Sequence, residues 1–321
     1  MADFLARPIG RRRFIRIGAT LAATAAFGIP ASAASPMRRW SGNALGAHAS
    51  IELVGTDAAL AEATFAVVEK EIARLEGLFS LYHADSALSR LNAAGRLDAP
   101  EADFLRLLAL ARSVHRETGG LFDPTVQPVF AAYASHYAGG RSDALPPAEL
   151  ADRLALVGFD QVVFDEAAVR FSLPGMAMTL NGIAQGYVTD RVADLLKARG
   201  FDNVLLDIGE IRVLGGGRDG VGWKVGLAAD PDGNTLADTL RLKDRAIATS
   251  MVAGTLLDAG GRVGHILHPR KGAVPSAFSS VSVVADGAAL ADALSTAAVL
   301  MSPDELARLD GAGVEIHATP A

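Results

Sequence analysis

The chain has 321 residues, half of them hydrophobic, and a formal net charge of −6 at pH 7. That length and apolar content suffice for one or two domains with a large core. The sequence contains no cysteine, which excludes disulfides, thiolate metal sites, iron–sulfur ligation and a lipidated N-terminal cysteine. The acidic balance disfavours nucleic acids and anionic membrane surfaces as partners.

The first 33 residues have the pattern of an export signal. Arginines at positions 11–13 precede an apolar, alanine-rich stretch over residues 17–29, and residues 31–33 form a small-x-small cleavage pattern. The paired arginines favour the twin-arginine route, so we expect a periplasmic protein. The apolar stretch is too short for a membrane anchor, and we expect no stable membrane insertion. The signal holds five arginines and one aspartate, so its removal would change the net charge from −6 to −10. We expect residues 34–321 to form one domain.

Helical and strand periodicities alternate along the rest of the chain. Apolar residues at spacings of three and four predict helices over residues 64–79 and 102–117, and over residues 184–200, where Gly200 is a natural C-cap. Short apolar or β-branched stretches predict strands at residues 47–54, 161–164, 204–208, 223–227, 246–249 and 281–284. Gly- or Asp-rich turns join several strands, which favours an α+β fold with mixed, largely antiparallel sheets flanked by helices. The Pro-rich residues 145–147 predict a loop.

Two glycine-rich segments invite a phosphate-binding interpretation. Gly215, Gly217 and Gly220 match G-x-G-x-x-G, but a strand pattern follows them, and a dinucleotide site needs a helix N-terminus there. We therefore interpret that segment as a β-turn. Residues 182–186 do open a helix, and their N–H groups could receive an anion, although close helix packing explains the small residues equally well.

Asp292 and Thr296 lie four residues apart in an otherwise uncharged helical stretch over residues 288–301. Their carboxylate and hydroxyl therefore share one helix face. Oxygen ligands of this kind suit a hard cation such as Mg²⁺. The alternative is an aspartate exposed on the wet side of the helix, because an unpaired buried carboxylate is costly.

His265 and His268 are three residues apart and suggest zinc, but no third ligand stands at an obvious spacing. A single histidine acting as general base is the more economical interpretation. Asp123 follows a glycine turn and precedes a helical pattern, so it is either an N-cap or a polar ligand contact.

Six segments, taken in order, resemble the ApbE family of FAD:protein FMN transferases from about Leu45 to the C-terminus. They are residues 79–92, 120–126, 181–187, 248–250, 265–272 and 291–297. Within the family, the chain is most similar to the periplasmic NosX members associated with nitrous oxide reductase systems. The similarity lies in the export signal and in the sequences of residues 180–190 and 207–211.

The resemblance implies an ApbE-like fold with a ligand cleft, and an enzyme that uses Mg²⁺ and FAD. Such an enzyme attaches FMN through a phosphoester to a Ser or Thr of an acceptor and releases AMP. For a NosX-like member the acceptor would be a NosR-like flavin-binding domain facing the periplasm.

The resemblance also implies roles for individual residues. His265 would be the general base, and Asp292 and Thr296 would bind Mg²⁺ together with a backbone carbonyl near Gly182. The FAD site would be formed by Leu45, Phe79, Ser80, Tyr82, Asn92, Leu121, Phe122, Asp123, Thr179, Gln185, Ser250 and Ile266.

The chain departs from the family pattern at four places. Leu45 stands where Met is usual, Gln185 where Lys or Glu is common, and the usual Gly-Gly-Asp is shortened to Gly209-Glu210. His268 stands where an Asp is expected. These departures leave two alternatives to the transferase: an accessory protein that binds FAD without transferring FMN, and an FAD pyrophosphatase that uses water instead of a protein hydroxyl.

Overall fold

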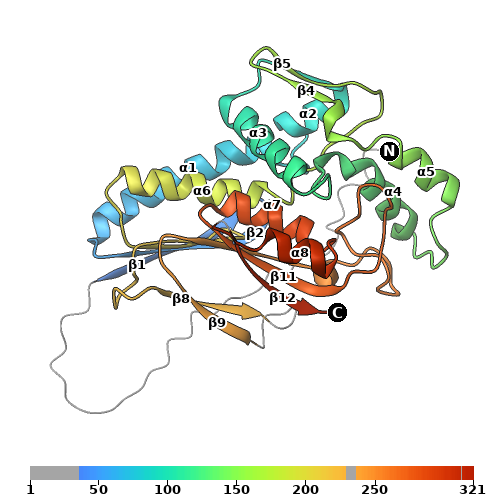
Figure 1. The fold of residues 1–321 in the computed structure, drawn as a ribbon. Helices are drawn as coiled ribbons and strands as arrows, with labels where there is room; N and C mark the ends of the chain where they lie inside the picture. The colour runs from blue at the N-terminus through green and yellow to red at the C-terminus, as the bar shows by residue number, and fades with distance from the viewer. Residues whose placement is uncertain (1–35, 229–235, 312) are drawn as a thin grey trace.

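The computed structural model describes residues 36–228, 236–311 and 313–321. The export signal predicted at residues 1–33 lies outside these described residues. Figure 1 shows a large twisted sheet with helices on one face and a second, mostly helical layer above them. The structure is an α+β fold, as the sequence predicts.

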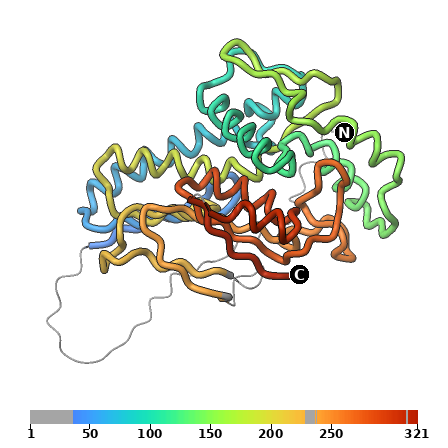
Figure 2. The backbone as a smooth tube through the Cα atoms, viewed as in Figure 1, coloured from blue at the N-terminus to red at the C-terminus, as the bar shows by residue number. Residues whose placement is uncertain are grey.

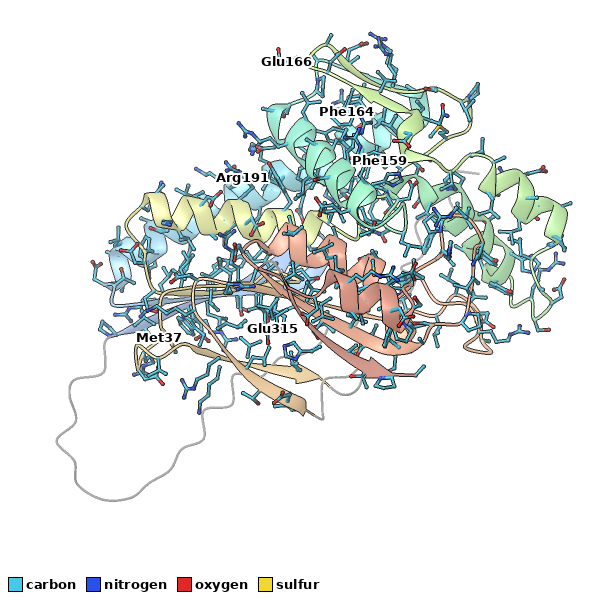
Figure 3. All side chains as sticks on the ribbon, viewed as in Figure 1. Met37, Phe159, Phe164, Glu166, Arg191 and Glu315 are labelled. Atoms are coloured by element: carbon cyan, nitrogen blue, oxygen red, sulfur yellow. The ribbon has the colours of Figure 1, made fainter. Side chains whose placement is uncertain are left out.

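Within the described residues the large sheet has seven strands, and each neighbouring pair is antiparallel. Their spatial order is β1 (Met37–Ala44), β2 (Ala47–Val54), β6 (Val204–Asp207), β7 (Ile211–Leu214), β10 (Ala246–Met251), β11 (Phe278–Ala285) and β12 (Glu315–Pro320). Met37 and Glu315 are labelled on the two edge strands in Figure 3. Four of the predicted strands, at residues 47–54, 204–208, 246–249 and 281–284, therefore lie in one sheet.

Helices α1 (Ala58–Phe79), α6 (Ala184–Ala198) and α7 (Ala288–Ala298) cover one face of this sheet. The predicted helix over residues 64–79 begins earlier than expected, because the Asp57 side chain caps it by accepting the N–H of Leu60 at 2.9 Å. Helix α6 ends at Ala198 with Arg199 as its C-cap, one residue before the predicted C-cap Gly200, which has a positive φ of 85°.

The opposite face of the sheet carries the hairpin of β8 (Trp223–Ala228) and β9 (Leu236–Leu242). Its buried side chains, Trp223 and Val225 among them, join a separate apolar cluster with residues of the large sheet. The G-x-G-x-x-G segment lies in the connection from β7 to β8, where Gly222 N–H donates to the carbonyl of Gly216 at 2.8 Å. A strand and not a helix follows it, so the β-turn interpretation is confirmed.

The upper layer holds α2 (Ala87–Ala94), α3 (Ala102–Glu117), α4 (Gln127–Ala138) and α5 (Pro147–Leu154), with a small sheet of β3 (Arg96–Asp98), β5 (Ala168–Phe171) and β4 (Val162–Phe164). Figure 2 shows this layer above the large sheet, while α8 (Pro303–Leu309) follows α7. The helix predicted over residues 102–117 is α3. The loop predicted at residues 145–147 is wrong at Pro147, which opens α5, because proline is well tolerated in the first helical turn.

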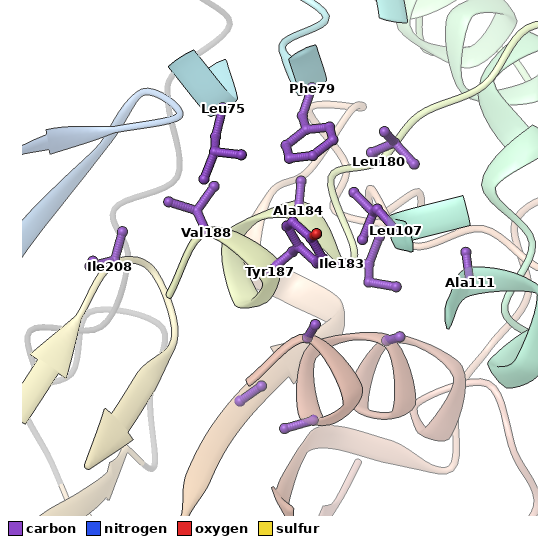
Figure 4. Close-up of a cluster of buried hydrophobic side chains, with 14 of the residues drawn as sticks. Leu75, Phe79, Leu107, Ala111, Leu180, Ile183, Ala184, Tyr187, Val188 and Ile208 are labelled. Atoms are coloured by element: carbon purple, nitrogen blue, oxygen red, sulfur yellow. The ribbon is translucent and has the colours of Figure 1, made fainter. Parts of the chain in front are cut away.

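One hydrophobic core joins the two layers, and the first turns of α6 lie at its centre. Figure 4 shows Ala184 and Tyr187 of α6 between Phe79 and α7. The Phe79 ring meets Tyr187 edge-on at 5.6 Å and stacks on Phe104 at 6.1 Å. In the described part of the chain, the helices are too short or too polar to cross a membrane.

Candidate functional site

The start of α6 lies directly against α7. The backbone N–H of Gly186 donates to the Asp292 carboxylate at 3.2 Å. A Cβ at position 186 would lie 2.3 Å from the carbonyl oxygen of Ala288, so only glycine allows this approach. Asp190 of α6 then accepts the N–H groups of Ala288 and Ala289 at 2.7 and 3.0 Å, and so caps α7 from a neighbouring helix.

This contact brings together the three residues predicted to bind a metal. A Cβ on Gly182 would lie 2.9 Å from the hydroxyl oxygen of Thr296, and Asp292 precedes Thr296 by one turn of α7. Asp292 is only 5% exposed, which rules out the alternative of an aspartate on the wet side of the helix. The Asp292 carboxylate and the Thr296 hydroxyl are oxygen donors of the kind that a hard cation takes, and Gly182 lies against Thr296. Among the described residues no group of three or more His, Cys, Asp and Glu is arranged to hold a metal ion.

Gln185 is buried beside these residues and packs on the turn after β6. Its amide nitrogen lies 2.6 Å from where a Cβ of Gly209 would stand, and Gly209 has a φ of +86°. Within the described structure the Gln185 Oε1 atom is buried and has no hydrogen-bond partner. Such an atom usually has a water or ligand donor, so Gln185 fits the role of a ligand contact. Glu210, the other departure in this turn, is also buried.

His265 lies at the base of a hairpin over residues 255–265. Its backbone N–H donates to the Thr255 carbonyl at 3.0 Å, and its ring Nδ1 lies 3.2 Å from the same oxygen. Because a carbonyl can only accept, Nδ1 carries the proton, and Nε2 is the basic nitrogen of the neutral ring. This geometry suits a general base.

The tip of the same hairpin is closed by Asp258, whose side chain is 1% exposed. Its carboxylate accepts the N–H groups of Arg262 and Val263, both at 2.8 Å, and the Arg262 guanidinium at 3.0 Å. The Arg262 guanidinium also donates to the Ser142 carbonyl at 2.8 Å, which ties the hairpin to the loop after α4. Sequence reasoning missed this role of Asp258, because an Asp-Ala-Gly-Gly run predicts only a turn.

His268 has a different environment from His265. It is buried, and its Nδ1 accepts the backbone N–H of Arg270 at 3.1 Å, as an aspartate side chain could in the same turn. Burial, followed by the charges of Lys271 and Arg270, lowers the pKa of His268, so the ring is neutral near pH 7. His268, although it replaces the usual aspartate, therefore still supplies a hydrogen-bond acceptor for the N–H of Arg270 in this turn.

The loop before α4 buries Leu121, Phe122 and Asp123. The Asp123 carboxylate accepts the N–H and hydroxyl of Thr125, at 2.8 and 2.5 Å, and the N–H of Phe159 at 3.1 Å. Asp123 is thus the predicted N-cap, of the short 3-10 turn Pro124–Val126 that precedes α4. Burial raises the pKa of its carboxyl, although the hydrogen bonds from Thr125 and Phe159 oppose this.

Asn92 and Thr179 hold the segment that leads into α6. The Asn92 amide donates to the carbonyl of Met178 and accepts its N–H, both at 2.8 Å. Thr179 N–H in turn donates to the Pro124 carbonyl at 2.8 Å, which joins this segment to the Asp123 loop. Asn92 therefore positions the backbone at Thr179.

Three predicted flavin residues follow one another near the end of α1. Phe79 is enclosed in the core with 1% exposure, and the Ser80 hydroxyl accepts the N–H groups of Tyr82 and His83. Tyr82 is 75% exposed. Of the three, Tyr82 has the ring most accessible to a ligand. Phe79 and Ser80 stabilise the fold, and their flavin contacts stay predictions.

Leu45 occupies the turn between β1 and β2 with an unusual φ of +47°, and its N–H donates to Glu76 of α1. A non-glycine residue in this region is strained, as residues at ligand sites often are. Ser250 is buried, with its hydroxyl 2.9 Å from that of Ser295 on α7, and Ile266 is partly buried beside His265. The flavin roles of these residues also stay predictions.

Comparison with known proteins gives a consistent result. The model of the ApbE family matches residues 45–316. A FAD:protein FMN transferase of Haemophilus influenzae is 28% identical over 263 residues, covering 78% of this chain and 76% of the relative. One of Vibrio cholerae is 28% identical over 244 residues, covering 74% and 73%.

Solved structures share the fold. The flavin transferase ApbE from Vibrio cholerae aligns with a TM-score of 0.75 and 24% identity, covering 89% of this chain and 97% of that one. The ApbE protein from Thermotoga maritima aligns with a TM-score of 0.79 and 24% identity, covering 88% and 94%. The family match over residues 45–316 and this shared fold lead to one conclusion: the chain belongs to the ApbE family.

Proposed function

We propose that this protein is an FAD:protein FMN transferase that uses Mg²⁺. The observation that carries the proposal is the meeting of Gly182, Asp292 and Thr296 at the contact of α6 with α7. The transferase names of the family relatives support it as well. The orphaned Oε1 of Gln185 is consistent with a bound ligand in the same place.

In the proposed reaction the acceptor hydroxyl oxygen bonds to the FMN phosphorus of FAD. The pyrophosphate P–O bond to the AMP half breaks, and AMP leaves. His265 takes the hydroxyl proton on Nε2, because its Nδ1–H is held by the Thr255 carbonyl. Asp292, Thr296 and the Gly182 carbonyl would hold Mg²⁺, which, when bound, neutralises charge on the pyrophosphate oxygens.

The location and the acceptor are part of the proposal. The arginine-rich start of the chain and its cleavage pattern support export by the twin-arginine route to the periplasm. The acceptor would be a NosR-like flavin-binding domain, modified on a Ser or Thr. The sequence features shared with NosX members support that choice.

The test is a mass spectrum of a NosR-like flavin-binding domain after incubation with this protein, FAD and Mg²⁺, with AMP measured in parallel. We expect a mass gain of one FMN and an equal amount of AMP. Substitutions His265→Ala and Asp292→Asn should each lower the rate at least about 100-fold. The matched control is His317→Ala on the edge strand β12, which should transfer normally.

Other outcomes would assign the alternatives. AMP release without acceptor modification would identify a pyrophosphatase. Intact FAD on the protein, with a NosR-like domain that a known transferase does modify, would identify an accessory protein. Either outcome would contradict the proposed transferase.

A further inference from the structure

A hollow of about 650 Å³ lies beside the candidate site, between the end of α3, the end of α5 and the segment after His268. Phe159, labelled in Figure 3, marks the neighbourhood, since Gly158 and Asp160 on either side of it line the wall. The lining residues are His115, Arg116, Gly119, Gly120, Asp123, Leu154, Val157, Gly158, Asp160, Pro269 and Arg270.

Three nitrogen-bearing side chains converge in this hollow. A Cβ on Gly120 would lie 3.1 Å from Arg270 Nη1 and 3.8 Å from His115 Nε2. The Arg270 guanidinium is anchored by donating to the Gly119 carbonyl at 3.0 Å. Arg116 is exposed and makes no hydrogen bond or ion pair with any described residue. Its charge is therefore available to a partner.

The acids of the hollow offset its cations only in part: the His115 ring lies 3.6 Å from the Asp123 carboxylate, whereas Arg116 and Arg270 form no ion pair with a described residue. The Asp123 carboxylate is buried and receives three donors from Thr125 and Phe159, as described above. Asp160 is exposed at the rim of the hollow, and its charge interacts with Arg112. Burial lowers the pKa of Arg112, and the Asp160 charge opposes this change. In a chain of net charge −6, the hollow is thus a place where an anionic group can be received.

The position of the hollow links it to the proposed reaction. Arg270 follows His265 by five residues. The Gly120–Asp123 loop forms one wall of the hollow and contains three of the residues predicted to contact FAD. Leu154, Val157 and Pro269 add apolar walls, which suit the aliphatic part of a peptide. A protein segment whose hydroxyl approaches His265 would therefore pass this hollow.

We propose that the hollow is a subsite for an acidic side chain of the acceptor protein, which Arg116 and Arg270 receive close to the modified Ser or Thr. This inference rests on the proposed transferase function. The subsite would select acceptors by charge near the modified residue, and most of its effect would fall on the KM for the acceptor.

The test compares Arg116→Glu with the control Arg199→Glu, using a NosR-like flavin-binding domain as the acceptor. Arg199 is also exposed near a helix C-terminus, at the far end of α6, and pairs with no described residue. We expect Arg116→Glu to raise the KM for the acceptor about tenfold, with a smaller change in kcat, and Arg199→Glu to change neither.

A second arm identifies the ligand. Acceptor variants in which the acids flanking the modified residue are replaced by amides should show the same rise in KM with the parent enzyme, and little further rise with Arg116→Glu. If inorganic phosphate competes with the acceptor while the amide variants bind normally, the hollow is a phosphate site and the proposal is wrong. An unchanged KM for Arg116→Glu would also overturn it.

Binding of the acceptor to the FAD-loaded protein, measured by calorimetry, separates the two proposals. Acceptor binding that weakens in Arg116→Glu, without any FMN transfer by the parent, would contradict the transferase and retain the subsite. FMN transfer by the parent, with acceptor binding that Arg116→Glu leaves unchanged, would support the transferase and contradict the subsite. No acceptor binding by the parent would overturn the subsite.

Discussion

The two halves of the candidate site are built in different ways. The helical half, residues 182–186 with residues 287–296, is held by buried backbone contacts between α6 and α7. The hairpin half, residues 255–265, is held by backbone hydrogen bonds across the hairpin and by the Asp258 carboxylate at its tip, with the Arg262 side chain 59% exposed. One half is fixed by the packing of two helices, and the other mainly by hydrogen bonds, with Val263 as its buried apolar side chain.

This difference suggests a division of tasks. Close packing leaves little room for movement, which suits residues that must hold a cation at fixed distances. A hydrogen-bonded surface hairpin opens at lower free energy, which suits a base that must admit a protein segment. We therefore expect substitutions in the helical half to lower both stability and activity, and substitutions in the hairpin half to lower activity alone.

The largest effect is expected from Gly186→Ala. The new Cβ would lie 2.3 Å from the Ala288 carbonyl oxygen and 2.5 Å from its carbon, and both atoms belong to the backbone. Helices α6 and α7 would have to separate, at a cost of about 3 kcal/mol in the free energy of unfolding. Urea unfolding measures this cost.

The control for this prediction is Gly77→Ala, on the exposed side of α1, where a Cβ would meet nothing within 4 Å. It should stabilise the protein by up to about 1 kcal/mol, since alanine favours the helix. Equal stability of the Gly186→Ala variant and the parent would show that the helical half is not fixed by this contact.

A smaller effect, confined to the hairpin, is expected from Asp258→Ala. The N–H groups of Arg262 and Val263 would lose their acceptor, so hydrogen exchange should speed up over residues 255–265 and not in α6 or α7. We expect FMN transfer to slow about tenfold, with FAD affinity unchanged. Faster exchange in α7 as well would break the proposed separation of the two halves.

The smallest effect is expected from Asp207→Asn, at the end of β6 and two residues before Gly209. Burial raises the pKa of Asp207 to about 6, against the opposing charge of Arg39. Because the folded state binds this proton more tightly than the unfolded chain, stability falls as the pH rises from about 4 to about 6 and stays lower above.

The asparagine variant lacks this dependence and should be about 1–2 kcal/mol more stable than the parent at pH 7.5, with little difference at pH 4. Urea unfolding at the two pH values measures the change. A variant less stable than the parent at pH 7.5 would mean that the charged carboxylate makes a stabilising contact.

The sequence predicts those elements whose apolar period is strong. Helix α3 appears over Ala102–Glu117 and strand β2 over Ala47–Val54, both as expected. It does not predict the edge strands β1 and β12, because their residues are largely polar and all but Ala44 are half-buried or exposed. Those strands exist because β2 and β11 offer unpaired backbone groups.

For the site, the residue types are already readable in the sequence: a carboxylate and a hydroxyl one turn apart at Asp292 and Thr296, a histidine, and small residues opening α6. That Gly182 contacts Thr296 and that Asp190 caps α7 became visible only in the folded chain. Local periodicity fixes which face of a helix is apolar, whereas contacts between segments a hundred residues apart depend on how the whole core packs.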